Sequence, residues 1–142
     1  MKTVQNPEIS LSFRRLALAQ CGATIFAAAL WWLGAIIGGF GMQNATAGAA
    51  EAGLLLIISL VLLALFSPSK KRPIATVATL WSATSFVRFL AALGGSTLLY
   101  YAAQFDLRSL MFSFLLTAVF LLVAETKVLA NSLSEYSTIT ND

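Results

Sequence analysis

The stretch that decides the fold is Ile74–Tyr101, which reads IATVATLWSATSFVRFLAALGGSTLLYY. A helix needs about 20 apolar residues to cross a bilayer, and this stretch is longer than that. One arginine, Arg88, lies near its middle. An ionisable side chain inside hydrocarbon is costly and requires a partner, so it marks a candidate site by default. The stretch therefore predicts a membrane-spanning helix that carries a charge.

The composition of the whole chain indicates a membrane protein. Hydrophobic residues make up 58% of the 142 residues, charged residues only 11%, and the mean hydropathy is +0.83. So few charges cannot cover the surface of a soluble domain of this length. The formal net charge is +3, but the basic residues lie at the ends of apolar runs, which is typical of topology signals rather than of a nucleic-acid interface. We expect membrane lipid as the surroundings and no nucleic acid as a partner.

Four apolar stretches are separated by short polar connections. The expected spans are about 16–37, 47–66, 74–101 and 107–129. A polar, exposed N-terminal arm over residues 1–12 precedes them, and a polar C-terminal tail over residues 131–142 follows. No linker divides residues 13–130. The sequence therefore predicts one domain, an all-α membrane protein with four transmembrane helices in an antiparallel bundle.

The distribution of cations predicts the orientation. Most basic residues flank the spans on one side, namely Lys2, Arg14, Arg15, Lys70, Lys71, Arg72 and Lys127. Arg108 falls on the other side. Because cytoplasmic loops carry an excess of Lys and Arg, both termini are expected in the cytoplasm.

The sequence lacks the patterns of enzymes and metal proteins. It has no His and a single Cys, so the ligands of a zinc site and the members of a Cys–His nucleophile are missing. It also has no glycine-rich phosphate loop and no nucleophile elbow. We therefore expect neither an enzyme nor a bound cofactor.

Small residues indicate where helices meet. Gly34 and Gly38 stand at the spacing that lets two helices approach closely, although glycines also collect near helix ends. Gln20, a polar residue in the first span, is able to hydrogen-bond across helices or to lie at the interface. One face of the third span carries small and polar residues at helical spacing, namely Trp81, Ser85, Arg88, Ala92 and Gly95. We expect this face to pack against a neighbouring helix.

Two carboxylates compete as partners of Arg88. At 1.5 Å per residue, Glu125 lies roughly 15 Å or more from Arg88 along the membrane normal, and Glu51 lies roughly 10 Å from it. We therefore expect Arg88 to pair with Glu51. We expect Glu125 to form a largely solvated interfacial pair with Lys127.

Three interpretations of Arg88 remain open. In the first, it is neutralised inside the bundle by Glu51, Ser85 and backbone carbonyls, and it serves packing alone. In the second, it faces a carboxylate on another membrane protein. In the third, it belongs to a proton or ion pathway, which normally needs several ionisable groups in sequence. The chain has few such groups.

The chain resembles the ATP synthase protein I family over most of residues 13–130. The resemblance rests on the basic turn Lys70-Lys71-Arg72, on Arg88 in the setting Val87-Arg88-Phe89-Leu90, and on the end of the last span, Phe120–Lys127. It implies a non-catalytic accessory protein of the bacterial inner (cytoplasmic) membrane that assists assembly of the c-subunit ring of F-type ATP synthases. Membrane arginines of relatives are proposed to engage the ion-binding carboxylate of the ring, and only Arg88 matches that role here.

Two other functions fit the same residues. The first is a small oligomeric pore or ion-transport protein, in which Arg88 and Glu51 line a water-filled path between protomers. The second is a membrane anchor for another complex. Ion flux through the purified protein in liposomes would support the first. Co-purification with a c subunit, lost on Arg88→Ala, would support the accessory role.

Overall fold

The computed structural model describes residues 7–141, and almost all of them are helical. The helices are α1 (Phe13–Ile37), α2 (Met42–Phe66), α3 (Ile74–Ala103) and α4 (Leu107–Asn141), and two short strands are β1 (Glu8–Ile9) and β2 (Arg72–Pro73). All four helices are long and apolar enough to cross a membrane, so the prediction of an all-α chain with four such helices is confirmed. Residues 1–6 of the predicted arm and residue 142 of the predicted tail lie outside the described residues.

Local sequence determines where the helices begin and end. Ser12 caps α1, because its side chain accepts a hydrogen bond of 3.3 Å from the backbone N–H of Arg15. After α1 the chain turns through Gly39 and Gly41, whose φ angles of 70° and 84° suit residues without a Cβ. Pro73 is the N-cap residue of α3. A proline lacks the backbone N–H that a helix interior needs, so α2 cannot continue through Pro73 into α3. The connections between the helices are consequently short.

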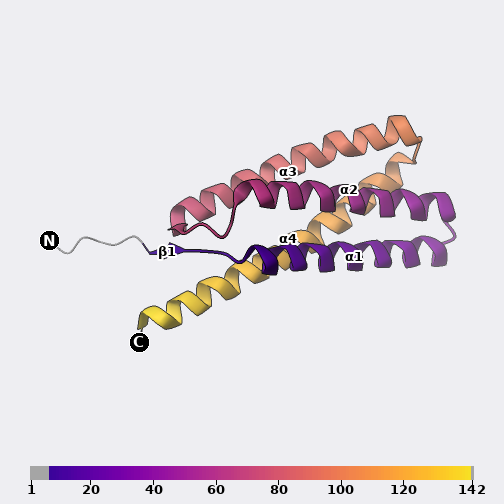
Figure 1. Cartoon of the computed structure of the whole chain (residues 1–142). Helices are drawn as coiled ribbons and strands as arrows, with labels where there is room; N and C mark the ends of the chain where they lie inside the picture. The colour runs from indigo at the N-terminus through magenta and orange to yellow at the C-terminus, as the bar shows by residue number, and fades with distance from the viewer. Residues whose placement is uncertain (1–6, 142) are drawn as a thin grey trace.

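Three helices form the centre of the fold, and the fourth lies at its edge. α1, α2 and α4 pack against one another, whereas α3 packs mainly on α2. Figure 1 shows α3 running along α2 while α4 crosses behind α1 and α2. The buried residues of α3 are Val77 and Ala92. α3 therefore leaves most of its apolar surface open to the surroundings.

The prediction for the small-residue face of α3 is confirmed. Ala92 is fully buried, and a Cβ placed on Gly95 would overlap the side chain of Leu54 on α2. The prediction that Gly34 and Gly38 mediate helix packing is wrong within the chain. A Cβ on Gly34 would meet open space, and Gly38 is the C-cap of α1. These two glycines mark a helix end.

Both terminal segments are more structured than the sequence predicted. β1 pairs with β2, and Ile9 and Leu11 are only 6% and 2% exposed. The described part of the arm therefore packs on the helices instead of forming an exposed arm. Helix α4 does not end near residue 129 but continues to Asn141. The reason is apolar residues at helical spacing within the polar segment, because Leu129, Leu133 and Tyr136 pack on the cluster that contains Ile9 and Leu11.

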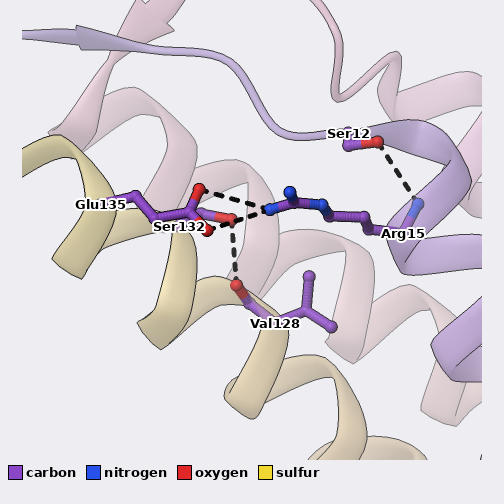
Figure 2. Close-up of polar contacts among 5 residues, drawn as sticks. All are labelled: Ser12, Arg15, Val128, Ser132 and Glu135. Atoms are coloured by element: carbon purple, nitrogen blue, oxygen red, sulfur yellow. Dashed lines mark hydrogen bonds and ion pairs between the residues drawn. The ribbon is translucent and has the colours of Figure 1, made fainter.

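The last turns of α4 contact the start of α1 through an exposed ion pair. Arg15 Nη1 donates to both carboxylate oxygens of Glu135, at 3.2 and 3.3 Å. Figure 2 shows this pair beside the Ser12 cap and the hydrogen bond from Ser132 to the Val128 carbonyl. The side chains of Arg15 and Glu135 are 60% and 62% exposed. Water and salt therefore screen this pair.

Replacing Glu135 is expected to have a small effect. Exposed ion pairs contribute about 0–1 kcal/mol, so Glu135→Ala should lower the free energy of unfolding by less than about 1 kcal/mol. Urea titrations in detergent micelles at low and high salt would measure the difference, which should shrink as salt is added. A loss of several kcal/mol would show that this pair anchors α4. Glu135→Gln is the control, because it removes the charge and keeps the shape of the side chain.

Candidate functional site

A buried ion pair joins α3 to α4 in the middle of the fold. Arg88 Nη1 donates to Glu125 Oε1, and Nη2 donates to Oε2 at 2.8 Å. The Glu125 side chain is 1% exposed and the Arg88 side chain 12%. Two parallel N–H to oxygen bonds are the strongest arrangement in which an arginine binds a carboxylate. This pair fixes the peripheral helix α3 to the central helix α4.

A side chain of α1 completes the group around Glu125. Gln20 Nε2 donates to Glu125 Oε1 at 2.5 Å, so this oxygen accepts hydrogen bonds from two helices. Ser85 and Ser59 line the same small pocket. Within residues 7–141, neither serine forms a hydrogen bond with Arg88 or Glu125. The interpretation in which Glu51 and Ser85 neutralise Arg88 is therefore wrong in its partners. Among the described residues, Glu125 alone neutralises Arg88, and Gln20 donates to Glu125.

The predicted pairing of Arg88 with Glu51 is therefore wrong. Counted from the connection between α3 and α4, Arg88 and Glu125 lie at a similar depth, roughly 25 Å along each helix at 1.5 Å per residue. The sequence estimate measured Glu125 from an end of the last span set near residue 129, but α4 continues to Asn141. The predicted pair of Glu125 with Lys127 is wrong as well, because Lys127 is exposed on the surface of α4 while Glu125 is buried.

Glu51 of α2 is a second buried carboxyl, in different surroundings. Its exposed fraction is 0%. Oε1 is hydrogen-bonded to Ser96 Oγ of α3 at 2.5 Å, and Oε2 has no hydrogen-bond partner. Of the basic residues that the structure describes, none forms an ion pair with Glu51. The fold thus contains one buried carboxyl with a cation and one without.

An apolar groove separates the second half of α3 from the first half of α4. This α3–α4 groove has a volume of about 470 Å³, and its walls include Phe89, Leu93, Ser96, Tyr100, Met111 and Phe114. A smaller pocket of about 150 Å³ shares Phe89 and Phe114 with the groove and reaches Arg88. Arg88 thus lines a pocket that adjoins the groove.

The cations that predicted the topology lie mainly at the start of α1 and between α2 and α3. Arg14, Lys70 and Lys71 are exposed. Arg72 donates to the Phe66 carbonyl at 2.9 Å and lies over the Phe66 ring, 5.5 Å from its centroid. Lys127 lies about two helical turns before Glu135 on α4. Because α4 continues to Asn141, Lys127 is further from the C-terminal end of its helix than the sequence predicted.

Sequence reasoning missed Ser96 and the contact at Gly48. A serine in an apolar run carries no charge signal, and only its position next to Gly95 on the packed face of α3 could have singled it out. Gly48 of α2 receives the indole of Trp31, and its carbonyl accepts a hydrogen bond of 2.9 Å from Ser113 of α4. No glycine pair at a four-residue spacing marks that position.

Comparisons with protein-family models, with curated proteins and with solved structures give no match. Over residues 7–141, no three His, Cys, Asp or Glu side chains gather in a way that could hold a metal ion. The buried polar groups instead carry one ion pair and one unpaired carboxyl. The Arg88–Glu125 ion pair and Glu51 are therefore the candidate functional groups of this chain.

Proposed function

We propose that this chain is a non-catalytic integral membrane protein that binds another membrane protein at the α3–α4 groove, where Arg88 recognises a carboxylate of the partner. The observation that supports this proposal is that Arg88 lines the pocket that adjoins the groove, on the least buried helix. Guanidinium has five N–H donors, and Glu125 engages one on each Nη. In the part of the chain that the structure describes, Nε donates to no acceptor. Donors thus remain for a second carboxylate.

We further propose that the four helices cross the bilayer as an antiparallel bundle with both termini in the cytoplasm. The cations at the start of α1 and in the connection from α2 to α3 support this orientation, because positive residues favour the cytoplasmic side. Apolar side chains such as Ile25, Val61 and Phe112 are more than half exposed, as expected of surfaces that face lipid. The bacterial inner membrane is the proposed location.

The proposed partner is the c subunit of an F-type ATP synthase. This step rests on the resemblance of the sequence to the ATP synthase protein I family. An arginine at this depth would hold a glutamate of the partner in its charged form, because an ion pair in hydrocarbon is far better than either ion alone. Since Glu125 already neutralises Arg88, the additional affinity should be modest. Modest affinity suits an assembly factor, which must release its subunits to one another.

Co-purification from native membranes tests this proposal. Tagged wild type should capture c subunit in mild detergent, identified by mass spectrometry. The double variant Arg88→Met/Glu125→Leu should lose it, since this variant lacks the recognising cation but leaves no buried charge unpaired. Lys127→Met removes a cation outside the groove and should retain the c subunit.

Two results would contradict the proposal. One is capture of c subunit by the double variant at the wild-type level. The other is the absence of every ATP synthase subunit from the wild-type sample. If only further copies of this chain are captured, the groove is a homo-oligomer interface. If a different complex is captured, the chain is an anchor for that complex.

The alternative of a small oligomeric pore or ion-transport protein finds support in Glu51, a buried carboxyl without a cation. A water-filled path lined by both Arg88 and Glu51 has less support, because Arg88 contacts Glu125 while Glu51 contacts Ser96. Ion flux through purified protein in liposomes, abolished by Glu51→Gln, would favour transport.

A further inference from the structure

The contacts of Ser96 bear on the protonation state of Glu51. Ser96 Oγ lies 2.5 Å from Glu51 Oε1 and 2.9 Å from the Ala92 carbonyl oxygen. A hydroxyl has one hydrogen, and a backbone carbonyl can only accept. If Ser96 donates to Ala92, as helical serines commonly do to the carbonyl four residues earlier, then the hydrogen between Ser96 and Glu51 belongs to Glu51. With Glu51 as a neutral acid, each of the two contacts has a hydrogen of its own.

The surroundings of Glu51 favour the same state. Glu51 is the only charged residue of α2, and α1 has none beyond Arg15. On α3 the only charged residue is Arg88. It lies about two helical turns from Ser96, the α3 residue that contacts Glu51, and it is bound to Glu125 of α4. The remaining charged side chains of α4, Arg108, Lys127 and Glu135, are exposed. Because a buried carboxylate without a cation is very costly, the group takes up a proton instead.

Ser96 also connects Glu51 to the surface. Its side chain lines the α3–α4 groove, while Glu51 behind it is fully buried. Thr97, Tyr100 and Tyr101 line the same groove towards the end of α3. These residues line the groove between Ser96 and the connection from α3 to α4. A hydroxyl is able to accept a proton on one side while it gives its own to an acceptor on the other.

We propose that Glu51 is a proton-binding site whose proton exchanges through Ser96 along the α3–α4 groove. On release, the hydroxyl hydrogen of Ser96 turns from the Ala92 carbonyl toward the groove and moves to a water molecule there, while the proton of Glu51 Oε1 moves to Ser96 Oγ. These steps leave a carboxylate and a hydronium ion. Loading is the reverse of these steps. The Glu51 site does not rest on the proposed role of Arg88, since the two buried carboxyls share no hydrogen bond. A partner seated in the α3–α4 groove would cover the exchange path, so the exchange is measured on the chain without a partner.

Infrared spectroscopy of the purified protein in lipid tests the protonation of Glu51. Neutral carboxyls have a C=O stretching band that carboxylates lack. Wild type at neutral pH should show this band, Glu51→Gln should lose it, and Glu125→Gln should retain it. The amide of Glu51→Gln is nearly isosteric with the neutral acid and can donate to Ser96, so this variant should fold. If wild type and Glu51→Gln give the same spectrum in this region, Glu51 is ionised and the proposal is overturned.

Transfer into D2O tests the exchange of the proton. The Glu51 band should shift as deuterium replaces the proton. Leu93→Trp, which narrows the groove, should slow the shift, whereas Leu98→Trp, on the same helix but outside the groove, should not. An unshifted band after prolonged exposure would show a locked structural proton. Loss of the band on adding Na⁺ but not K⁺ at constant pH would show a sodium site instead. Either result would overturn the proposal.

Discussion

Glu125→Leu is expected to lower the free energy of unfolding by about 3–5 kcal/mol, the cost of breaking a buried ion pair by removing one partner. The substitution leaves Arg88 on α3 facing the interior without its carboxylate, and a guanidinium cannot lose its proton. Arg88→Met should cost less, because Glu125 still accepts a hydrogen bond from Gln20. The double variant should recover most of the loss. Unfolding titrations in mixed micelles would give the four free energies of this cycle.

The coupling between the two positions distinguishes this explanation from simple loss of packing. If Arg88 and Glu125 contributed independently, the cost of the double variant would equal the sum of the single costs, and the pairing would be refuted. Glu51→Gln is the matched control, since it changes a buried glutamate that has no cation. It should cost much less than Glu125→Gln in the same titration.

Hydropathy was sufficient to predict the number and the approximate positions of the helices. The spans around 16–37, 47–66 and 74–101 lie within α1, α2 and α3, because apolar length is a strong signal in a chain with so few charges. The structure of the two terminal segments of the chain was less predictable. Leu11 and Leu133 belong to polar segments, and their packing depends on a cluster assembled from distant parts of the chain. Only the three-dimensional arrangement shows that contact.

The partners of the buried charges could not be predicted for the same reason. Choosing between Glu51 and Glu125 required the depth of each residue, and an error of a few turns in the end of α4 reversed the choice. That Arg88 needed a partner was predictable from its position in an apolar run. That Glu51 lacks a cation was not, since it follows from the pairing of Arg88 with Glu125.

Gly48→Ala is expected to have the second largest effect, a loss of about 1–3 kcal/mol from overpacking. A Cβ at Gly48 would overlap the indole of Trp31, which cannot move freely because its Nε1 donates to the Asn44 carbonyl at 3.0 Å. The carbonyl of Gly48 also accepts from Ser113, so α1, α2 and α4 meet at this residue. Any displacement of the indole therefore disturbs three helices.

Gly34→Ala provides the control, because a Cβ there meets open space. Alanine is favoured over glycine inside helices by about 1 kcal/mol, so this variant should be as stable as wild type or more so. Trp31→Leu should cost less in the Gly48→Ala background than in wild type, since the smaller side chain leaves room for the added methyl group. Equal stability of Gly48→Ala and wild type in the same unfolding titration would show that the helices separate there without cost. The close approach of α1 to α2 at Gly48 would then not be required for stability.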